Sequence, residues 1–254
     1  TLVPTLNFIT AQGDLNNGLA AGFKQPALVI PSSFIENDTM IVSPVDKYDI
    51  FPDGNKLNIG SNDGDHIVAL VEYADRILQF KQKIVYIINI SEDIEYIEDE
   101  FPYYGIDYPY QVVKTDKGVA WVNRDGCYMY DGEEIKNLID GKIKPSGGSN
   151  GWQMRVADLI MDFSWNEWNS ADKMISYIPK NQQIVVFAAP YSLPGTKFGN
   201  VLIYDIKTES WAHGFDRVKE GIKSNPIIDF DNLLMYGSII NNSSQDFIVH
   251  NYFG

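Results

Sequence analysis

A two-strand pattern that recurs along the chain constrains its fold more than any other feature. It is clearest in residues 73–90, YADRILQFKQKIVYIINI, where the apolar runs 77–80 and 84–90 flank a short basic turn at 81–83. Apolar runs of this length on either side of a short polar turn are typical of β-hairpins. The fold then depends on whether this hairpin stands alone or is one unit of a repeat.

The same pattern is predicted three more times. Residues 118–130, GVAWVNRDGCYMY, give strand, turn and strand, and Asn-Arg-Asp-Gly at 123–126 supplies the turn chemistry. Residues 183–206 contain QIVVFAAP, a Pro/Gly-rich loop and NVLIYDI, while 233–252 contain LLMYGS, a polar loop and DFIVHNY. The hairpin is therefore a repeating unit.

The repeat length indicates the architecture. With Leu78, Ala120, Val185 and Leu234 taken as equivalent positions, successive steps are 42, 65 and 49 residues. Two of the three lie near the roughly 40 to 50 residues of a four-stranded propeller blade.

The long step coincides with the sequence at 147–172, GGSNGWQMRVADLIMDFSWNEWNSAD. Val156, Leu159, Ile160 and Phe163 are spaced as i, i+3, i+4 and i+7, which predicts an amphipathic helix near 152–170 inserted between two blades.

We therefore predict an all-β fold, a β-propeller or incomplete propeller of about four to six blades with one inserted helix. The blades are expected over 61–254, with the helical insertion at 147–172. Residues 1–60, rich in Pro, Asn and Asp, are expected to form an extended arm or part-blade. A β-sandwich is the structural alternative, but its turn signals do not group into larger repeats. Both chain ends look cut or processed, so we treat the 254 residues as part of a longer polypeptide.

Composition narrows the functional classes. A formal net charge of −14 argues against a grip on nucleic-acid phosphates, which needs clustered Lys and Arg. The single cysteine, Cys127, excludes an internal disulfide framework and suits a reducing compartment. No apolar run approaches the roughly 20 residues of a membrane-spanning helix.

Two stretches resemble known propeller sequences. VLIYDIKTESW, residues 201–211, resembles the closing strands of kelch-type blades, in which Tyr204 and Trp211 would fill the wedge between blades and 207–209 would form an exposed turn. Residues 63–88 and 114–135 resemble β-propeller virion proteins of tailed bacteriophages, of the tail-nozzle and DNA-stabilising stopper type. The matching positions are Asp75, Arg76, Lys81, Tyr86, Gly118, Trp121, Gly126, Tyr128, Tyr130, Asp131 and Gly132.

The phage resemblance implies a structural protein of the virion tail that is made in the host bacterial cytoplasm and is not an enzyme. It implies a cyclic homo-oligomer that contacts other tail or portal-proximal proteins, while DNA passes nearby without specific binding. Two alternatives remain open: a propeller-type glycan hydrolase or lectin, and a kelch-like adaptor. A ring-shaped oligomer would favour the phage tail protein. Saccharide turnover or binding would favour the glycan hydrolase or lectin.

Candidate chemical sites are sparse. His66, His213 and His250 have no ligand spacing between them, and Cys127 is expected to be a small core residue, so we predict no metal, cofactor or catalytic group. Asn62, Asp63 and Asp65 could serve a calcium ion, but Asn-Asp-Gly is ordinary turn composition and we expect a turn.

The sharpest polar feature is SEDIEYIEDEFPYYGIDYPY, residues 91–110. It reads either as a solvated loop or as a protein-contact loop, because exposed Tyr with Pro offers a rigid contact surface. The protein-contact candidates are Glu92, Asp93, Glu95, Glu98, Asp99, Glu100, Tyr103, Tyr104, Tyr108 and Tyr110. Independently, Trp121 and Tyr130 are predicted to be blade-core residues, since they alternate on strands that flank a turn.

Overall fold

The structure of the chain is a computed structural model. It describes residues 2–4, 38–44, 46–47, 49–60, 63–92, 94–143, 152–156, 159–163, 165, 173–187, 198–219, 226–228, 233–239 and 247–251. These residues form antiparallel β-sheets, with one short 3-10 turn at Pro109–Gln111. No helix among the described residues is long and apolar enough to cross a membrane. The predicted all-β class is confirmed.

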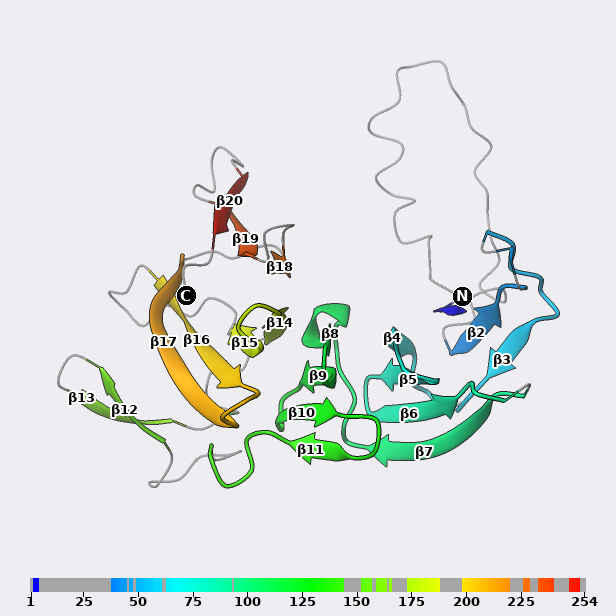
Figure 1. The fold of residues 1–254 in the computed structure, drawn as a ribbon, viewed down its shortest axis with the longest axis horizontal. Helices are drawn as coiled ribbons and strands as arrows, with labels where there is room; N and C mark the ends of the chain where they lie inside the picture. Colours follow the sequence, from blue (N-terminus) through cyan, green and yellow to red (C-terminus); the bar gives the residue numbers. More distant parts are fainter. Residues whose placement is uncertain are drawn as a thin grey trace, which may run out of the picture.

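The strands follow one another through the sheets in chain order (Figure 1). The first sheet contains β1 (Leu2–Pro4), β2 (Thr39–Val42) and β3 (Lys56–Asn58). The second contains β4 (Ile67–Tyr73), β5 (Arg76–Lys81), β6 (Ile84–Asn89) and β7 (Tyr96–Pro102). The third contains β8 (Val112–Thr115), β9 (Gly118–Val122), β10 (Cys127–Tyr130) and β11 (Ile135–Asn137).

A two-stranded hairpin separates the third sheet from the fourth. It consists of β12 (Trp152–Val156) and β13 (Leu159–Phe163). The fourth sheet contains β14 (Met174–Ile178), β15 (Gln183–Phe187), β16 (Phe198–Asp205) and β17 (Ser210–Lys219). The last contains β18 (Ile227–Ile228), β19 (Leu234–Ile239) and β20 (Phe247–Asn251).

The sequence repeat corresponds to a structural repeat. Leu78 lies on β5, Ala120 on β9, Val185 on β15 and Leu234 on β19, and each of these is the second strand of its sheet. Equivalent positions in the sequence are therefore equivalent positions in successive sheets.

A turn at the end of the third strand repeats as well. Asn89 ends β6 and its Oδ1 accepts the Ser91 N–H at 2.9 Å. Asp131 follows β10 and accepts the N–H groups of Glu133 and Glu134, and Asp205 ends β16 and accepts those of Lys207 and Thr208. Asn and Asp favour such turns because their short side chains bond backbone N–H groups two or three residues later. The three four-stranded sheets therefore share a local turn as well as a strand order.

Successive sheets contact one another chiefly through their first strands. β1 contacts β4, β4 contacts β8, β8 contacts β14, and β14 contacts β18. Figure 1 shows the sheets following one another in an arc. First strands that meet their counterparts leave the fourth strands, β7, β11 and β17, at the free edges of their sheets. The described residues therefore show a succession of antiparallel sheets, and they do not show a closed propeller.

The predicted inserted helix is wrong. Residues 152–156 and 159–163 are instead the paired strands β12 and β13, in a register that joins Trp152 to Phe163 and Val156 to Leu159. The apolar spacing that suggested a helix spans eight residues, which is shorter than the window over which helical and strand periods can be told apart. The rest of the predicted helix, apart from Trp165, lies outside the described residues.

Apolar side chains fill the spaces between sheets. Trp121 is fully buried and Tyr130 is 2 % exposed, which confirms both as core residues. Every residue of β9 and β10 is buried, so both faces of these strands pack against other parts of the protein. These strands lie between the second and fourth sheets and contribute to both adjoining cores.

The kelch-like stretch packs as predicted. Tyr204 and Trp211 are cross-strand partners, 4 % and 8 % exposed, with ring centroids 5.1 Å apart. The Trp211 indole N–H donates to the Leu138 carbonyl at 2.8 Å, which ties the fourth sheet to the chain that follows the third. Residues 207–209 are exposed in the turn.

Candidate functional site

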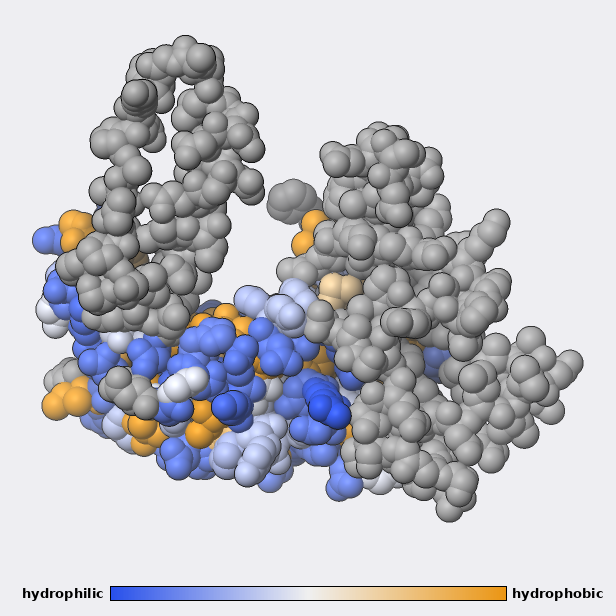
Figure 2. Space-filling model, turned by 180° about the vertical axis from the view of Figure 1, so that it is seen from behind, coloured by the Kyte–Doolittle hydropathy of each residue, from blue (hydrophilic) through white to orange (hydrophobic). Residues whose placement is uncertain are grey.

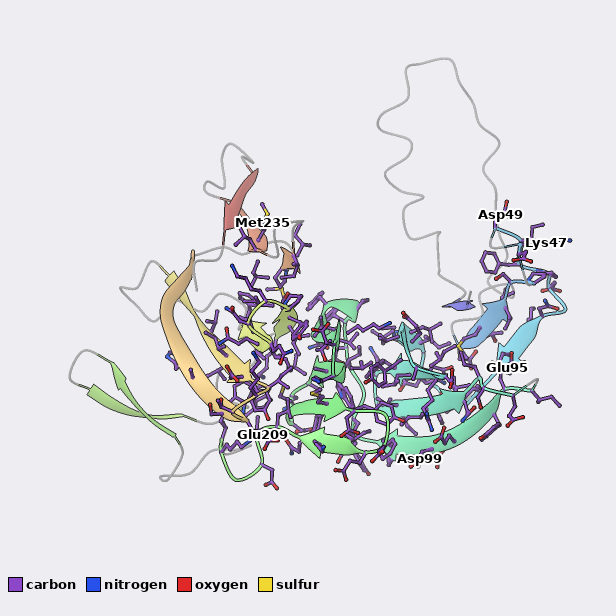
Figure 3. All side chains as sticks on the ribbon, in the orientation of Figure 1. Lys47, Asp49, Glu95, Asp99, Glu209 and Met235 are labelled. Atoms are coloured by element: carbon purple, nitrogen blue, oxygen red, sulfur yellow. The ribbon has the colours of Figure 1, made fainter. Side chains whose placement is uncertain are left out.

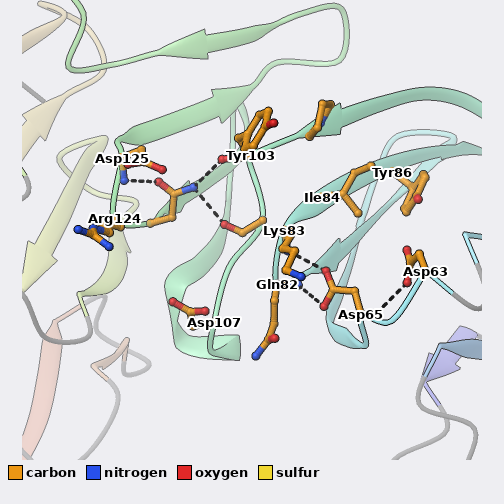
Figure 4. A pocket seen from close by; sticks show the side chains of 13 residues that line it. Asp63, Asp65, Gln82, Lys83, Ile84, Tyr86, Tyr103, Asp107, Arg124 and Asp125 are labelled. Atoms are coloured by element: carbon orange, nitrogen blue, oxygen red, sulfur yellow. Dashed lines mark hydrogen bonds between the residues drawn. The ribbon is translucent and has the colours of Figure 1, made fainter.

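A pocket of about 480 Å³ opens where three connections meet at one end of the second and third sheets (Figure 4). The connections are the β5–β6 turn, the chain that leaves β7, and the β9–β10 turn. Its lining residues are Asp63, Asp65, Gln82, Lys83, Ile84, Tyr86, Pro102, Tyr103, Gly105, Asp107, Asn123, Arg124 and Asp125. Its lining combines carboxylates, two cationic side chains and an exposed tyrosine.

Two of the carboxylates, Asp63 and Asp65, form contacts within the protein. Asp65 accepts the N–H groups of Gln82 and Lys83 at 3.2 and 2.8 Å, so it fixes the β5–β6 turn. Asp63 forms an ion pair with the fully buried Lys81 at 2.9 Å, and Lys81 also donates to the Gly60 carbonyl. The predicted turn at 61–66 lies partly outside the described residues, which exclude Asn62; in its described part the Asp65 N–H donates to the Asp63 carboxylate at 2.9 Å.

The charge of Asp63 is stabilised by these contacts. Partial burial opposes its ionisation, but hydrogen bonds from Lys81 and from the Asp65 N–H hold the pKa of Asp63 below its ordinary value. The neighbouring Tyr86 shows the opposite effect, because burial and the nearby charges of Asp63 and Glu100 raise the pKa of its hydroxyl. Tyr86 therefore stays neutral at physiological pH and serves as packing.

Asn123 organises the opposite wall of the pocket. Its Oδ1 accepts the N–H groups of Asp125 and Gly126, and its Nδ2 donates to the carbonyls of Tyr103 and Gly105. Its own carbonyl accepts the Trp165 indole N–H at 3.0 Å. The buried side-chain amide of Asn123 thus joins the β9–β10 turn to the chain that leaves β7. The sequence predicted only a turn at 123–126 and not this connection.

The pocket mouth carries the remaining polar groups. Arg124, Asp125 and Asp107 are exposed there, beside the ring of Tyr103, which is 82 % exposed. Tyr103 has φ of 74°, a left-handed conformation that costs a non-glycine residue of order 1 kcal/mol. Its N–H donates to the Lys83 carbonyl at 2.7 Å, which is one contact that maintains the strained backbone.

The tyrosines of the predicted contact stretch divide into two groups. The rings of Tyr104 and Tyr128 pack with their centroids 4.6 Å apart, and the Tyr104 carbonyl accepts the Trp121 indole N–H. Tyr104 therefore joins the second sheet to the third. Tyr110 packs partly against the core of the fourth sheet and stacks on Tyr108, with centroids 5.0 Å apart. Of the four, Tyr103 and Tyr108 have exposed side chains.

The acidic half of that stretch is not a loop. Residues 96–102 form β7, an edge strand that is exposed at every position except Phe101. Glu98 is bound by Asn89, on the adjacent strand β6, and by Arg76, on β5. The two contacts from Arg76, at 2.7 and 2.8 Å, form a bidentate ion pair. The hydrogen bonds of Arg76 outweigh burial and lower the pKa of Glu98.

Four of the other acidic contact candidates have no opposite charge beside them among the described residues. Glu92, Asp99 and Glu100 are exposed and Glu95 is half-buried, and none of them forms an ion pair with a described residue. Figure 3 labels Glu95 at the end of β7 nearest β3 and Asp99 farther along the strand. Asp93 lies outside the described residues.

The remaining predicted chemical groups are structural or exposed. Cys127 is buried, and burial raises the pKa of its thiol, which keeps it protonated. Burial lowers the pKa of His213 to about 4, so its ring is neutral at physiological pH. His66 is exposed, and the side chain of His250 lies outside the described set. Among described residues, no three His, Cys, Asp or Glu side chains converge as metal ligands.

Comparison with family models and with curated proteins found no match to the chain. Its function must therefore be argued from the fold, the pocket and the exposed edge of the second sheet.

Proposed function

We propose that the chain is a structural protein of a bacteriophage tail, which contributes to the tail channel or nozzle through protein–protein contacts. The resemblance at 63–88 and 114–135 supports this proposal, as does a scaffold of repeated sheets whose fourth strands face outward. The observation that carries it is the surface of β7, an exposed edge strand on which Asp99 and Glu100 form no ion pair with a described residue. A surface of this kind suits contact with a partner better than chemistry on a small substrate.

The proposed assembly is a cyclic homo-oligomer. A head-to-tail contact between copies generates a ring when its rotation closes, and each copy then presents the same surface to its neighbour. The ring would surround the path of DNA, and its other faces would meet further tail or portal-proximal proteins. The protein would reside in the virion after synthesis in the host bacterial cytoplasm.

The mass of the purified chain in solution tests this assembly. Native mass spectrometry over a range of protein concentrations should show one closed oligomer, with no continuous ladder of larger species. A mass equal to one chain at every concentration would contradict a ring formed by this chain alone.

A second candidate function is saccharide binding, favoured by the pocket mouth. An exposed aromatic ring beside carboxylate and guanidinium groups offers both stacking and hydrogen bonds to a sugar. Titration with a panel of oligosaccharides tests it, with Tyr103→Ala as the variant that should lose binding. In the proposed structural role no saccharide is turned over. Turnover that disappeared on substitution of one carboxylate, Asp107 or Asp125, would replace that role with an enzymatic one.

A further inference from the structure

A second pocket lies at the opposite end of the second sheet from the polar one. It has a volume of about 460 Å³ and is lined by Val42, Leu70, Val71, Glu72, Ile77, Ile90 and Glu95. Val42 belongs to β2, whereas the other six come from β4, β5 and the two ends of the β6–β7 connection. The pocket is thus an opening between the first and second sheets, with five apolar side chains inside and two carboxylates among its lining.

The surface beside this pocket is unusually apolar. Four large apolar side chains are exposed within eight residues: Ile90 at 36 %, Ile94 at 77 %, Tyr96 at 48 % and Ile97 at 44 %. They make up four of the ten exposed large apolar side chains in the described part of the chain, so apolar exposure is concentrated in the segment that borders the pocket at Ile90 and Glu95. Apolar patches break the hydrophilic surface at lower left in Figure 2, on the side where β6 and β7 lie. Clustered apolar exposure of this kind marks interaction sites.

The negative charges around the pocket favour a basic binding partner. Glu72 is bound by Lys114 at 2.5 Å, whereas Glu92 and Glu95 form no ion pair with a described residue. Asp99 and Glu100 on β7 likewise form no ion pair within the part of the chain that the structure describes. A second copy docked edge to edge through the same strand would place like charges opposite one another, which is destabilising. A basic partner would be attracted instead.

We propose that the pocket between the first and second sheets receives a segment of another protein in which an apolar residue is flanked by lysine or arginine. The apolar side chain enters between Val42, Leu70 and Ile77, while the flanking cations face Glu95 and Glu92. A central apolar anchor surrounded by complementary charges is the usual arrangement of a small protein interface. The inference rests on the proposed function, since both assign the chain a role in protein contacts, and it adds the chemistry of the partner.

A synthetic peptide tests the proposal directly. The probe is a fluorescent peptide in which one leucine is flanked on each side by two lysines, titrated with the full chain and followed by anisotropy. Replacing the leucine by serine should weaken binding by about tenfold, the effect of losing one buried apolar side chain. Replacing the lysines by glutamate should abolish binding.

Protein variants locate the contact. Glu95→Gln should weaken peptide binding by about threefold, as expected for one exposed charge pair. Ile90→Asn should weaken it by at least as much, and a thermal melt of each variant checks that it is folded. Glu133→Gln is the matched control, because Glu133 is an exposed carboxylate on the β10–β11 turn, away from the pocket.

Three results would overturn the proposal. They are absence of binding, equal binding of the leucine and serine peptides, and equal weakening by Glu133→Gln and Glu95→Gln, the last two of which indicate unspecific charge attraction. Self-association of the chain that Ile90→Asn abolishes and the peptide does not displace would assign the pocket to a second copy. None of these results depends on ring formation, so failure here is distinct from failure of the proposed assembly.

Discussion

At the residue scale, a few buried polar contacts join one sheet to the next. The indole N–H groups of Trp121, Trp165 and Trp211 each donate to a backbone carbonyl distant in sequence, at 2.8 to 3.0 Å. Burying an indole without such a partner would cost the desolvation of its N–H. These tryptophans therefore fix how the sheets meet as well as filling space between them.

Trp121 provides the clearest test of this role. Its ring lies 5.3 Å from that of Phe80 and 5.7 Å from that of Tyr128, and no part of it is exposed. Trp121→Ala should lower the free energy of unfolding by about 3 to 5 kcal/mol, measured by urea denaturation. Trp121→Phe keeps most of the apolar contact and loses the bond to Tyr104, so it should cost clearly less. Equal losses from the two variants would contradict the packing described.

Lys173 gives a prediction for pH. Its side chain is buried over the Trp165 ring at 5.3 Å, and burial lowers its pKa to about 8. Between about pH 8 and pH 10 this lysine binds more protons in the unfolded chain than in the folded protein, so its contribution to stability rises with pH across that window. The net rise should be about 1 kcal/mol and level off near pH 9, because the Cys127 thiol ionises there in the unfolded chain but stays protonated where it is buried.

Denaturant unfolding at a series of pH values measures this effect. Lys173→Met has no titrating group at this position, so its stability should lack the rise. A parallel pH dependence in the parent and in Lys173→Met would show that Lys173 is not the group responsible.

Residue identity alone predicted some of these positions and missed others. Trp121, Tyr130, Tyr204 and Trp211 were predictable because large aromatic residues on short strands have few alternatives to burial. The role of Asn123 was not, because its partners at 103 and 105 lie in the connection that follows β7, far from the turn in sequence. Nothing in the turn sequence reveals which carbonyls will lie across from it.

At the scale of elements, the strand repeat was predictable and the inserted element was not. Hairpins were identified from apolar runs and turn residues, and these are local signals. The stretch 152–163 also satisfies a strand reading, with Trp152, Met154 and Val156 at alternating positions. Its pairing as β12 and β13 could be chosen over a helix only by knowing the register between the two halves.

The β4–β5 turn offers a test of local geometry. Tyr73 and Arg76 pair across it, and Ala74 has φ of 52°. Alanine pays about 1 kcal/mol for this conformation, whereas glycine adopts it without steric cost, although glycine loses more freedom on folding. Ala74→Gly should therefore raise the melting temperature slightly or leave it unchanged.

Ala69→Gly is the matched control for that turn. Ala69 lies within β4 and packs partly against the core of the second and third sheets. Glycine in a strand interior should lower stability by about 0.5 to 1 kcal/mol, because it adds freedom to the unfolded chain. Similar destabilisation by both variants would show that the backbone at Ala74 is not strained.

At the scale of the whole molecule, the excess of negative charge predicts how the protein treats DNA. The formal net charge of −14 gives a surface that repels phosphates, but salt limits this repulsion to about 8 to 10 Å at moderate ionic strength. A ring around DNA would let it slide only if acidic side chains lined the passage closely.

A gel-shift assay with duplex DNA measures this property. The chain should show no binding even at low salt, where attraction to phosphates would be strongest. Tight binding that weakens as salt is added would mean that a basic surface outweighs the net charge, and would remove the argument for sliding.

The proposed function requires that copies of this chain assemble into a ring through one repeated contact. Image reconstruction of the assembled protein by electron microscopy would show this ring. We expect a cyclic ring whose central passage is lined by Asp and Glu side chains. Separate single copies, or a ring with a basic or apolar inner wall, would contradict it.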